Sequence, residues 1–442
     1  MKPHLLTCCL LFLASCHTHV SNPAPPPLGA TGAPTAHTQT TQGNVEAKAT
    51  LAAVGDLLMH GMVKQSAVAA NQKNEEGKSS NHDGYGALFK EITPLIQSAD
   101  YAFANLETPV APKNNKGTRS MVFNVSASLL PALSDSGFDL VSMANNHVYD
   151  QGRKGLTETL KHLDASELDY IGAGKTCAEA RQPHVTSING ISVAFIGATR
   201  LFNNNLNETD DTHCSFLLEP AQAIESVQAA REAGAEFVVL SLHWGREYRT
   251  KPQSEAIELA HTLLDNGDDL ILGHHAHVLQ PIEIYETKDG RKGVVAYSLG
   301  NFISNQSAWY QYKLHGHEHG NTRDGIVLFI DLLRVNYGKG PGGEPMIRTE
   351  LANIRAIPTW TINKKTEQSG KRRPYIRVVE THRLRRFAQE QLKTETNEKE
   401  MLQLKKNIEL YNTRMRQVAR ILGYGFIAQA PTPEPTTDDD VP

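Results

Sequence analysis

Five short polar segments of this sequence carry side chains that can bind metal ions. They are Gly55-Asp56, Asn105-Leu106-Glu107, Asn145-Asn146-His147 with Asp150, His243-Trp244-Gly245 with Glu247, and His274-His275-Ala276-His277. Carboxylate, amide and imidazole groups suit borderline divalent ions such as Mn, Fe or Zn. Two such ions could lower the pKa of a shared water molecule and hold the group that it attacks. The residue types therefore predict a site for borderline divalent metal ions.

Each segment also has a purely structural interpretation. A Gly-Asp pair is common in turns, Asn145 or Asn146 could cap a helix, and His243-Trp244 could pack in a core. Three imidazoles within four residues, at 274–277, are harder to explain by packing alone. The metal-site hypothesis depends on whether the fold brings all five segments together.

The strands and helices predicted around these segments indicate that the fold brings all five together. Alternating strands and helices indicate an α/β sheet covered by helices. Five polar segments lie at or just after strand ends, and open α/β sheets bind ligands beyond the carboxyl ends of their strands. We predict buried strands from apolar runs at 50–55, 101–105, 139–144, 193–197, 237–242 and 269–273, and helices near 86–98, 127–137, 152–165, 220–233 and 253–266. A hairpin turn is predicted at Asn189-Gly190.

The order of the motifs resembles a known family. Gly-Asp, Asn-Leu-Glu, Ala-Asn-Asn-His-x-x-Asp-x-Gly, His-Trp-Gly-x-Glu, Gly-His-His-x-His-Val and Ser-Leu-Gly-Asn-Phe at 298–302 are similar to motifs of the CapA poly-γ-glutamate capsule synthesis family. That family belongs to the calcineurin-like metallophosphoesterase superfamily, and the resemblance covers about residues 50–305. It implies an α/β fold, a four-layer α/β/β/α sandwich with a two-metal centre.

The resemblance also implies roles for individual residues. The implied metal ligands are Asp56, Glu107 as the bridging group, Asn146, His243, His275 and His277. His147 matches the catalytic histidine, which protonates the leaving group or stabilises the transition state. His274 could replace His275 if the register of the loop differs. Asn145, Asp150 and Glu247 could orient a ligand or have no role in the site, and Glu247 could equally form a surface salt bridge.

Two departures from the superfamily pattern leave the activity open. Leu58 stands where the Asp-x-His motif has a histidine, and His60 is a possible substitute. Glu107 stands in place of the usual aspartate, which moves the bridging oxygen by one methylene. The alternatives are therefore an enzyme that hydrolyses or transfers an ester or amide, and a non-catalytic capsule-assembly subunit that binds a polyanion.

The N-terminus predicts export and lipidation. Leu5 to Leu13 form an apolar run too short to cross a bilayer, which is typical of a secretory signal. Leu13-Ala14-Ser15-Cys16 resembles the lipobox of bacterial lipoproteins, which implies lipidation of Cys16; an ordinary signal peptide or a misassigned start are the alternatives. The predicted location is the bacterial cell envelope through a lipid anchor. His17 favours the outer membrane, facing the periplasm, in a Gram-negative source.

Composition and pattern divide the rest of the chain. We predict a lipoprotein signal peptide at 1–16, a disordered Pro/Ala/Thr-rich tether at 17–48, the metallophosphatase-like domain at 49–360, a mainly helical C-terminal extension at 361–429, and a disordered acidic tail at 430–442. Cys177 and Cys214 could pair, but two buried free thiols are slightly favoured. A formal net charge of −4 argues against nucleic acid as a partner.

The resemblance implies an anionic polymer as the substrate, namely poly-γ-glutamate or a related capsule polymer, or else a small envelope phosphoester. Capsule-synthesis membrane proteins are expected partners if the family resemblance extends to function. Lys371-Arg372-Arg373 could contact an anionic polymer or simply face water. The segment 306–324, with three histidines, could form a rim over the site, but a solvated loop is favoured.

Overall fold

The computed structural model describes residues 43–71, 82–114, 121–204, 212–368 and 370–428. The predicted signal peptide with Cys16, residues 17–42 of the predicted tether, and the acidic tail at 430–442 lie outside these residues. Among the described residues, no helix is long and apolar enough to span a bilayer.

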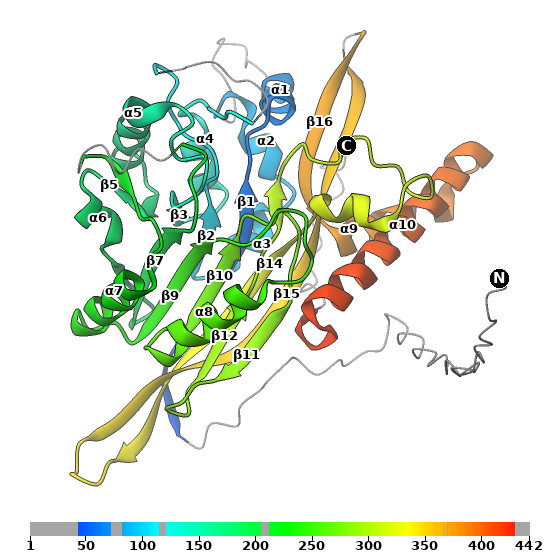
Figure 1. The fold of residues 1–442 in the computed structure, drawn as a ribbon. Helices are drawn as coiled ribbons and strands as arrows, with labels where there is room; N and C mark the ends of the chain where they lie inside the picture. The colour runs from blue at the N-terminus through cyan, green and yellow to red at the C-terminus, as the bar shows by residue number, and fades with distance from the viewer. Residues whose placement is uncertain (1–42, 72–81, 115–120, 205–211, 369, 429–442) are drawn as a thin grey trace, which may run out of the picture. The chain divides into compact units, whose positions relative to one another are not determined.

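Two sheets face each other in the centre of the molecule (Figure 1). The first has the order β16-β15-β14-β1-β2-β3-β4, with β13 also paired to β1, and the second has the order β11-β12-β10-β9-β7-β6. A separate two-stranded sheet pairs β5 with β8. The strands are β1 Asn44–Leu57, β2 Tyr101–Asn105, β3 Leu140–Ser142, β4 Asp169–Ile171, β5 Ala173–Gly174, β6 His184–Ile188, β7 Ile191–Thr199, β8 Cys214–Ser215, β9 Phe237–His243, β10 Leu270–His274, β11 Ile282–Glu286, β12 Lys292–Ala296, β13 Asn301–Ile303, β14 Asp324–Lys339, β15 Pro345–Gln368 and β16 Lys371–Glu380.

Helices cover the outer face of each sheet. Helices α1 to α5 pack on the first sheet and α6 to α8 pack on the second. The helices are α1 Gly61–Ala70, α2 Gly86–Phe89, α3 Thr93–Ile96, α4 Leu129–Asp135, α5 Gly152–Asp164, α6 Cys177–Arg181, α7 Pro220–Glu232, α8 Ser254–Asp265, α9 Thr381–Thr394 and α10 Glu398–Leu422, with 3-10 turns η1 His82–Gly84, η2 His317–Arg323 and η3 Tyr424–Phe426. The predicted four-layer α/β/β/α sandwich is therefore confirmed.

Alternation along the strands builds this sandwich. In β1, Leu51 and Ala53 point into the apolar layer between the sheets, whereas Ala52 and Val54 point towards the helices. Strands buried on both faces give the continuous apolar runs seen in the sequence. All six strands predicted from those runs are present.

Three predicted features differ in detail. The helix predicted near 86–98 is two short helices, α2 and α3, because Pro94 in the first turn of α3 cannot donate the amide hydrogen bond that a continuous helix needs. Strand β1 begins at Asn44, so residues 44–48, predicted to belong to the disordered tether, form part of a strand. The boundary predicted at 360–361 falls inside β15, because the β15–β16 hairpin extends the first sheet.

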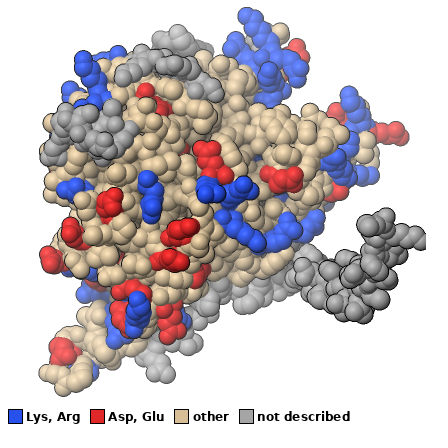
Figure 2. Space-filling model, viewed as in Figure 1, with Lys and Arg blue, Asp and Glu red and all other residues tan. Residues whose placement is uncertain are grey.

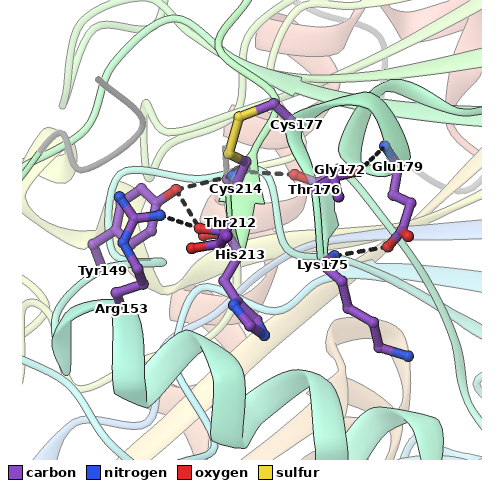
Figure 3. The surroundings of a disulfide bond; sticks show 11 residues. Tyr149, Arg153, Gly172, Lys175, Thr176, Cys177, Glu179, Thr212, His213 and Cys214 are labelled. Carbon is purple, nitrogen blue, oxygen red and sulfur yellow. Dashed lines mark hydrogen bonds between the residues drawn. A yellow bond between two sulfur atoms is a disulfide. The ribbon is translucent and has the colours of Figure 1, made fainter. Parts of the chain in front are cut away.

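The preference for two free thiols was wrong. Cys177, the first residue of α6, forms a disulfide with Cys214 of β8 (Figure 3). The pairing of β5 with β8 brings the two cysteines together across a sequence separation of 37 residues. The hairpin predicted at Asn189-Gly190 is confirmed, since both residues have positive φ, as a two-residue turn of this type requires.

The C-terminal helices are joined to the sandwich. Val418 and Leu422 of α10 belong to the apolar layer between the sheets. Arg414, also in α10 and fully buried, donates to both carboxylate oxygens of Asp324 at the start of β14. Helix α10 is drawn in red beside the β14–β15 part of the sheet in Figure 1.

Candidate metal centre

The strand ends bring the predicted ligands to one edge of both sheets. In the first sheet, Asp56 of β1 pairs with Asn105 of β2, and Glu107 follows two residues later. In the second sheet, His274 of β10 pairs with His243 of β9. His275 and His277 follow β10 directly. Residues far apart in the sequence thus become neighbours because the ends of these strands lie on the same side of the molecule in both sheets.

Glu107 lies at the centre of the cluster. Its Oε1 is 3.7 Å from Nε2 of His243, 3.9 Å from Nε2 of His277 and 3.9 Å from Nε2 of His147. These separations are too long for hydrogen bonds. The separations of His243 and of His277 from Glu107 each match two ligand atoms that share a cation, because ligands about 2.0–2.2 Å from one ion lie roughly 3–4 Å from each other.

Two overlapping groups of ligand atoms result. One contains Glu107, His243 and His275, and the other contains Asp56, Glu107 and His277. Glu107 is common to both, the position that a bridging carboxylate would take. Asn146 joins the first group, since its Oδ1 is 2.9 Å from Nε2 of His243.

Buried polar atoms without partners test whether these residues fit a metal ion. Both carboxylate oxygens of Glu107 are fully buried and accept no hydrogen bond, and Nδ1 of His275 and Nε2 of His277 also lack partners. Buried polar groups in proteins are nearly always satisfied, so such a concentration needs an explanation. Divalent cations would satisfy them, and the set of one bridging carboxylate, a second carboxylate, an amide and imidazoles fits Mn, Fe or Zn.

The pKa shifts of the two carboxylates have opposite signs. Burial and the neighbouring charge of Asp56 raise the pKa of Glu107 well above its usual range. Burial alone would also raise the pKa of Asp56, but hydrogen bonds from His274 and His277 outweigh it and the pKa falls well below the usual range. Asp56 is thus held ionised by the protein, whereas ionised Glu107 needs a cation beside it.

Two of the proposed ligands, His243 and His275, are held in the neutral form that binds metals. Burial lowers the pKa of His243 well below its usual value, and neighbouring imidazoles add to the shift. Burial also lowers the pKa of His275 to about 4, with a further contribution from His277. A neutral imidazole keeps the lone pair that a metal ion requires.

His147 is positioned for a different task. Its Nδ1 lies 2.8 Å from Oδ2 of Asp150, and Phe123 packs on the imidazole with ring centroids 4.4 Å apart. Donation from Nδ1 to the carboxylate fixes the ring and turns Nε2, which has no partner, towards Glu107. Asp150, an uncertain position in the sequence, therefore orients His147, and it also accepts from the backbone NH of Phe123.

The other uncertain positions have separate places. Asn145 donates to the backbone oxygen of Leu106 and accepts from the backbone NH of His147, so it ties two motif loops together. Nδ1 of His274 is 3.2 Å from Oδ1 of Asp56, and it is His275, rather than His274, that belongs to the first ligand group. His60 accepts from the backbone NH of Asn305 and belongs to neither group, and Glu247 is partly exposed at the edge of the site.

Close backbone contacts explain the glycines of the motifs. A Cβ atom on Gly55 would lie 1.9 Å from the backbone oxygen of Gly300, and the NH of Asp56 donates to that same oxygen. Only glycine allows this approach, which aligns Asp56 with the Ser-Leu-Gly-Asn-Phe segment. His275 and His277 both have positive φ, a strained backbone that is frequent at functional sites.

Two asparagines of the site were not recognised as such in the sequence. Asn105 donates to Oδ1 of Asp56 at 2.8 Å, and its Nδ2 lies 3.4 Å from Nδ1 of His243. Asn203 contacts Asn146 and His147. Asn105 was visible as the first residue of the Asn-Leu-Glu motif, whereas Asn203 lies in the run Asn203-Asn204-Asn205, which carries no recognisable spacing.

A cavity of about 450 Å³ opens beside the centre. Its lining includes Tyr248, whose ring centroid is 6.0 Å from that of His277, and His319 and Asn321 of η2. Part of the segment 306–324 therefore lines this cavity. The buried Arg414 of α10 donates to Oδ1 of Asn321 and to the backbone oxygen of His317, which connects the C-terminal helices to this segment.

Comparisons with known proteins agree with the motif pattern. A family model described as bacterial capsule synthesis protein PGA_cap matches residues 50–306. The chain is 30% identical over 300 residues to the capsule biosynthesis protein CapA of Bacillus anthracis, covering 66% of this chain and 68% of that protein. It is 31% identical over 247 residues to the PGA biosynthesis protein CapA of Bacillus subtilis (strain 168), covering 54% of this chain and 63% of the relative.

The NAD nucleotidase NadN of Haemophilus influenzae is among the similar solved structures. It is 15% identical, with a TM-score of 0.37 over 84% of this chain and 61% of the nucleotidase. At that TM-score the likeness is too low to support an inference about function.

Proposed function

Because this chain belongs to the PGA_cap family of bacterial capsule synthesis proteins, we propose that it is a metal-dependent hydrolase or transferase of the cell envelope. Its role would lie in the synthesis, export or processing of poly-γ-glutamate or a related capsule polymer. The observation that carries the proposal is the convergence of buried, unpartnered ligand atoms on Glu107. The related capsule proteins of two Bacillus species support the polymer pathway and the envelope location.

The proposed ligands are Asp56, Glu107, Asn146, His243, His275 and His277. Bound divalent ions would activate water and neutralise charge that develops on the attacked ester or amide. The chain itself supplies the proton chemistry. Asp150 holds His147 through Nδ1, so Nε2 is directed at the centre and can deliver a proton to the leaving group. Phe123 covers one face of the imidazole and limits access of water to it.

A matched pair of substitutions tests the enzyme proposal. Asn146→Ala removes a proposed ligand and should weaken metal binding. His147→Ala should retain the metal and the fold but lower turnover roughly 10²–10⁴-fold, the usual contribution of a general acid. Metal content and hydrolysis of p-nitrophenyl phosphate, bis-p-nitrophenyl phosphate and poly-γ-glutamate are measured for both variants. His162→Ala, in α5 and partly exposed, is the control histidine.

A non-catalytic polyanion-binding subunit is the second candidate. The observation that favours it is the basic tip of the β15–β16 hairpin, where Lys and Arg side chains gather in the upper part of Figure 2. The exposed cations there are Lys364, Lys365, Lys371, Arg372 and Arg373. The buried Leu58, which replaces a ligand histidine of the superfamily, favours the same candidate.

Capsule output of cells that carry the same two variants separates the two candidates. A polymer-binding subunit would retain capsule output after loss of one imidazole. If His147→Ala supports near-normal output at full metal occupancy, the enzyme proposal is wrong. Binding of poly-γ-glutamate that disappears when Lys371, Arg372 and Arg373 are replaced by Ser would then favour the subunit.

A further inference from the structure

Asn203 lies against the proposed centre, four residues after the end of β7, and no sequence motif marks it. Its Oδ1 accepts a hydrogen bond of 3.3 Å from Nδ2 of Asn146, and its backbone NH donates to the backbone oxygen of Asn146 at 3.0 Å. Asn146 in turn directs Oδ1 towards Nε2 of His243 at 2.9 Å. Asn203 therefore contacts both the side chain and the backbone of a proposed metal ligand.

We propose that Asn203 is a positioning residue that turns the amide oxygen of Asn146 towards the metal centre, and that the Cys177–Cys214 disulfide holds the segment that carries Asn203. An amide can bind a cation only through its oxygen, because the NH₂ group has no free lone pair. The oxygen and the NH₂ group of an Asn amide have nearly the same size and shape, so packing alone does not choose between the two orientations of the amide. A hydrogen-bond acceptor on the far side of Asn146 makes this choice.

The neighbouring groups leave one consistent orientation. If the Asn203 amide were reversed, its NH₂ group would face the NH₂ group of Asn146. If Asn146 were also reversed, its NH₂ group would point at the cluster. Nδ1 of His147 lies 3.3 Å from Nδ2 of Asn203, but it is committed to Asp150 at the shorter distance of 2.8 Å. The main bond of the Asn203 side chain is therefore the one to Asn146.

The backbone before Asn203 is fixed by β8 and by a proposed ligand. The NH of Arg200 donates to the backbone oxygen of His243. Thr199 exchanges backbone hydrogen bonds with the segment after β8, donating to Phe216 and accepting from Leu218. The placement of Asn203 thus depends on where β8 lies.

The disulfide fixes β8. Cys214 is bonded to Cys177 at the start of α6 (Figure 3). The next residue, Ser215, donates its backbone NH to the hydroxyl of Tyr149 at 3.0 Å. Tyr149 lies between His147 and α5, and its ring packs edge-on against Phe202 with centroids 5.3 Å apart. Two routes therefore connect the disulfide with the centre: through Thr199 to Asn203, and through Tyr149 to His147.

The inference rests on the proposed function only in that a divalent cation is taken to bind at Asn146. Loss of a residue that orients a metal ligand commonly weakens metal binding 10–100-fold. We expect Asn203→Leu, which keeps the approximate volume but offers no acceptor, to weaken Mn²⁺ binding by about this factor. Asn203→Asp keeps an acceptor oxygen facing Asn146 and should bind Mn²⁺ within a few-fold of the unsubstituted chain.

The disulfide is tested with the double variant Cys177→Ser/Cys214→Ser, which avoids thiol reductants that themselves bind metals. It should show weaker Mn²⁺ binding in the same direction as Asn203→Leu. Mn²⁺ affinity is measured by isothermal titration calorimetry on metal-stripped protein, and the melting temperature of each metal-free variant reports whether it folds. Asn266→Ala, at the end of α8, is the matched control.

Each outcome decides a part of the inference. Equal Mn²⁺ affinity of Asn203→Leu and the unsubstituted chain overturns the role of Asn203. Equal weakening by Asn203→Asp and Asn203→Leu overturns the acceptor argument. Full affinity in the folded double serine variant overturns the role of the disulfide. An unsubstituted chain that binds no Mn²⁺ overturns the inference and the metal centre together, whereas absence of hydrolysis with normal Mn²⁺ binding overturns only the enzyme proposal.

Discussion

Replacement of Glu107 by Gln should stabilise the metal-free protein. In the presence of metal ions, the unsubstituted protein should instead be the more stable of the two. In the metal-free protein, Glu107 is a buried carboxylate whose two oxygens accept no hydrogen bond. A buried polar group left unsatisfied costs about 1–3 kcal/mol, and a charged one more. The amide introduced by Glu107→Gln would be neutral and could donate to the imidazole nitrogens around it. Metal-free Glu107→Gln should therefore be more stable than the metal-free unsubstituted chain, by about 1–3 kcal/mol near pH 7.

The sign of the pH dependence follows from the raised pKa of Glu107. Below its unfolded value near 4.5, Glu107 is protonated in both states and carries no penalty. As the pH rises above that value, the unfolded chain releases the proton first, so the metal-free folded state loses stability until its own raised pKa is reached. The advantage of Glu107→Gln should thus be near zero at pH 4 and should grow with pH, by at most about 1.4 kcal/mol per pH unit.

Metal ions should invert the comparison. At a free concentration one hundred times its Kd, a single bound ion stabilises the folded state by about 2.7 kcal/mol. The unsubstituted chain should gain this stability on addition of Mn²⁺, whereas Glu107→Gln should gain little because the bridging carboxylate is lost. Thermal and urea unfolding of both proteins, stripped with EDTA and reloaded with Mn²⁺, measures the effect.

Glu232→Gln, an exposed residue at the end of α7, is the control and should follow the unsubstituted chain. The reasoning is refuted if metal-free Glu107→Gln is no more stable than the unsubstituted chain at pH 7, or if Mn²⁺ stabilises both equally.

Three further predictions concern the rest of the chain. Arg414→Ala leaves the buried carboxylate of Asp324 without its partner and should lower the free energy of unfolding by about 3–5 kcal/mol in urea titrations. The control Arg416→Ala, at an exposed position, should change the free energy of unfolding by less than about 0.5 kcal/mol. Similar losses in the two variants would contradict the stabilising role of the buried ion pair. Burial lowers the pKa of His382 to about 4. As the pH falls below about 6.5, His382 is therefore protonated in the unfolded chain before it is protonated in the folded one. The free energy of unfolding should decrease between pH 6.5 and pH 4 by up to about 1.4 kcal/mol per pH unit. His382→Phe should be less sensitive to pH over this range in the same unfolding assay, and an unchanged slope would refute the assignment. Cys16→Ser should release the protein from membranes or leave it unprocessed, and membrane retention that still requires detergent for release would show that Cys16 is not the anchor.

The sequence by itself determined the α/β class, the positions of most strands and helices, and the ligand types, whereas the four layers were implied by the family resemblance. Strands buried on both faces leave continuous apolar runs, and helices leave amphipathic patterns, so both could be located from local composition. Asp56, Glu107, His243 and the histidines at 274–277 could be proposed because each follows a strand whose end is visible in the sequence. The break between α2 and α3 could also have been read locally, from Pro94.

Only the tertiary structure decided which atoms meet. The choice of His275 over His274 depends on a strained loop with positive φ after β10, and local patterns do not specify that backbone. The disulfide depends on the pairing of β5 with β8, which sets the separation of Cys177 and Cys214. Asn203 contacts Asn146 because the segment that follows β7 of the second sheet lies beside the segment that follows β3 of the first sheet. Such contacts join residues distant in the chain, and sequence periodicity reports the burial of a face but not its neighbour.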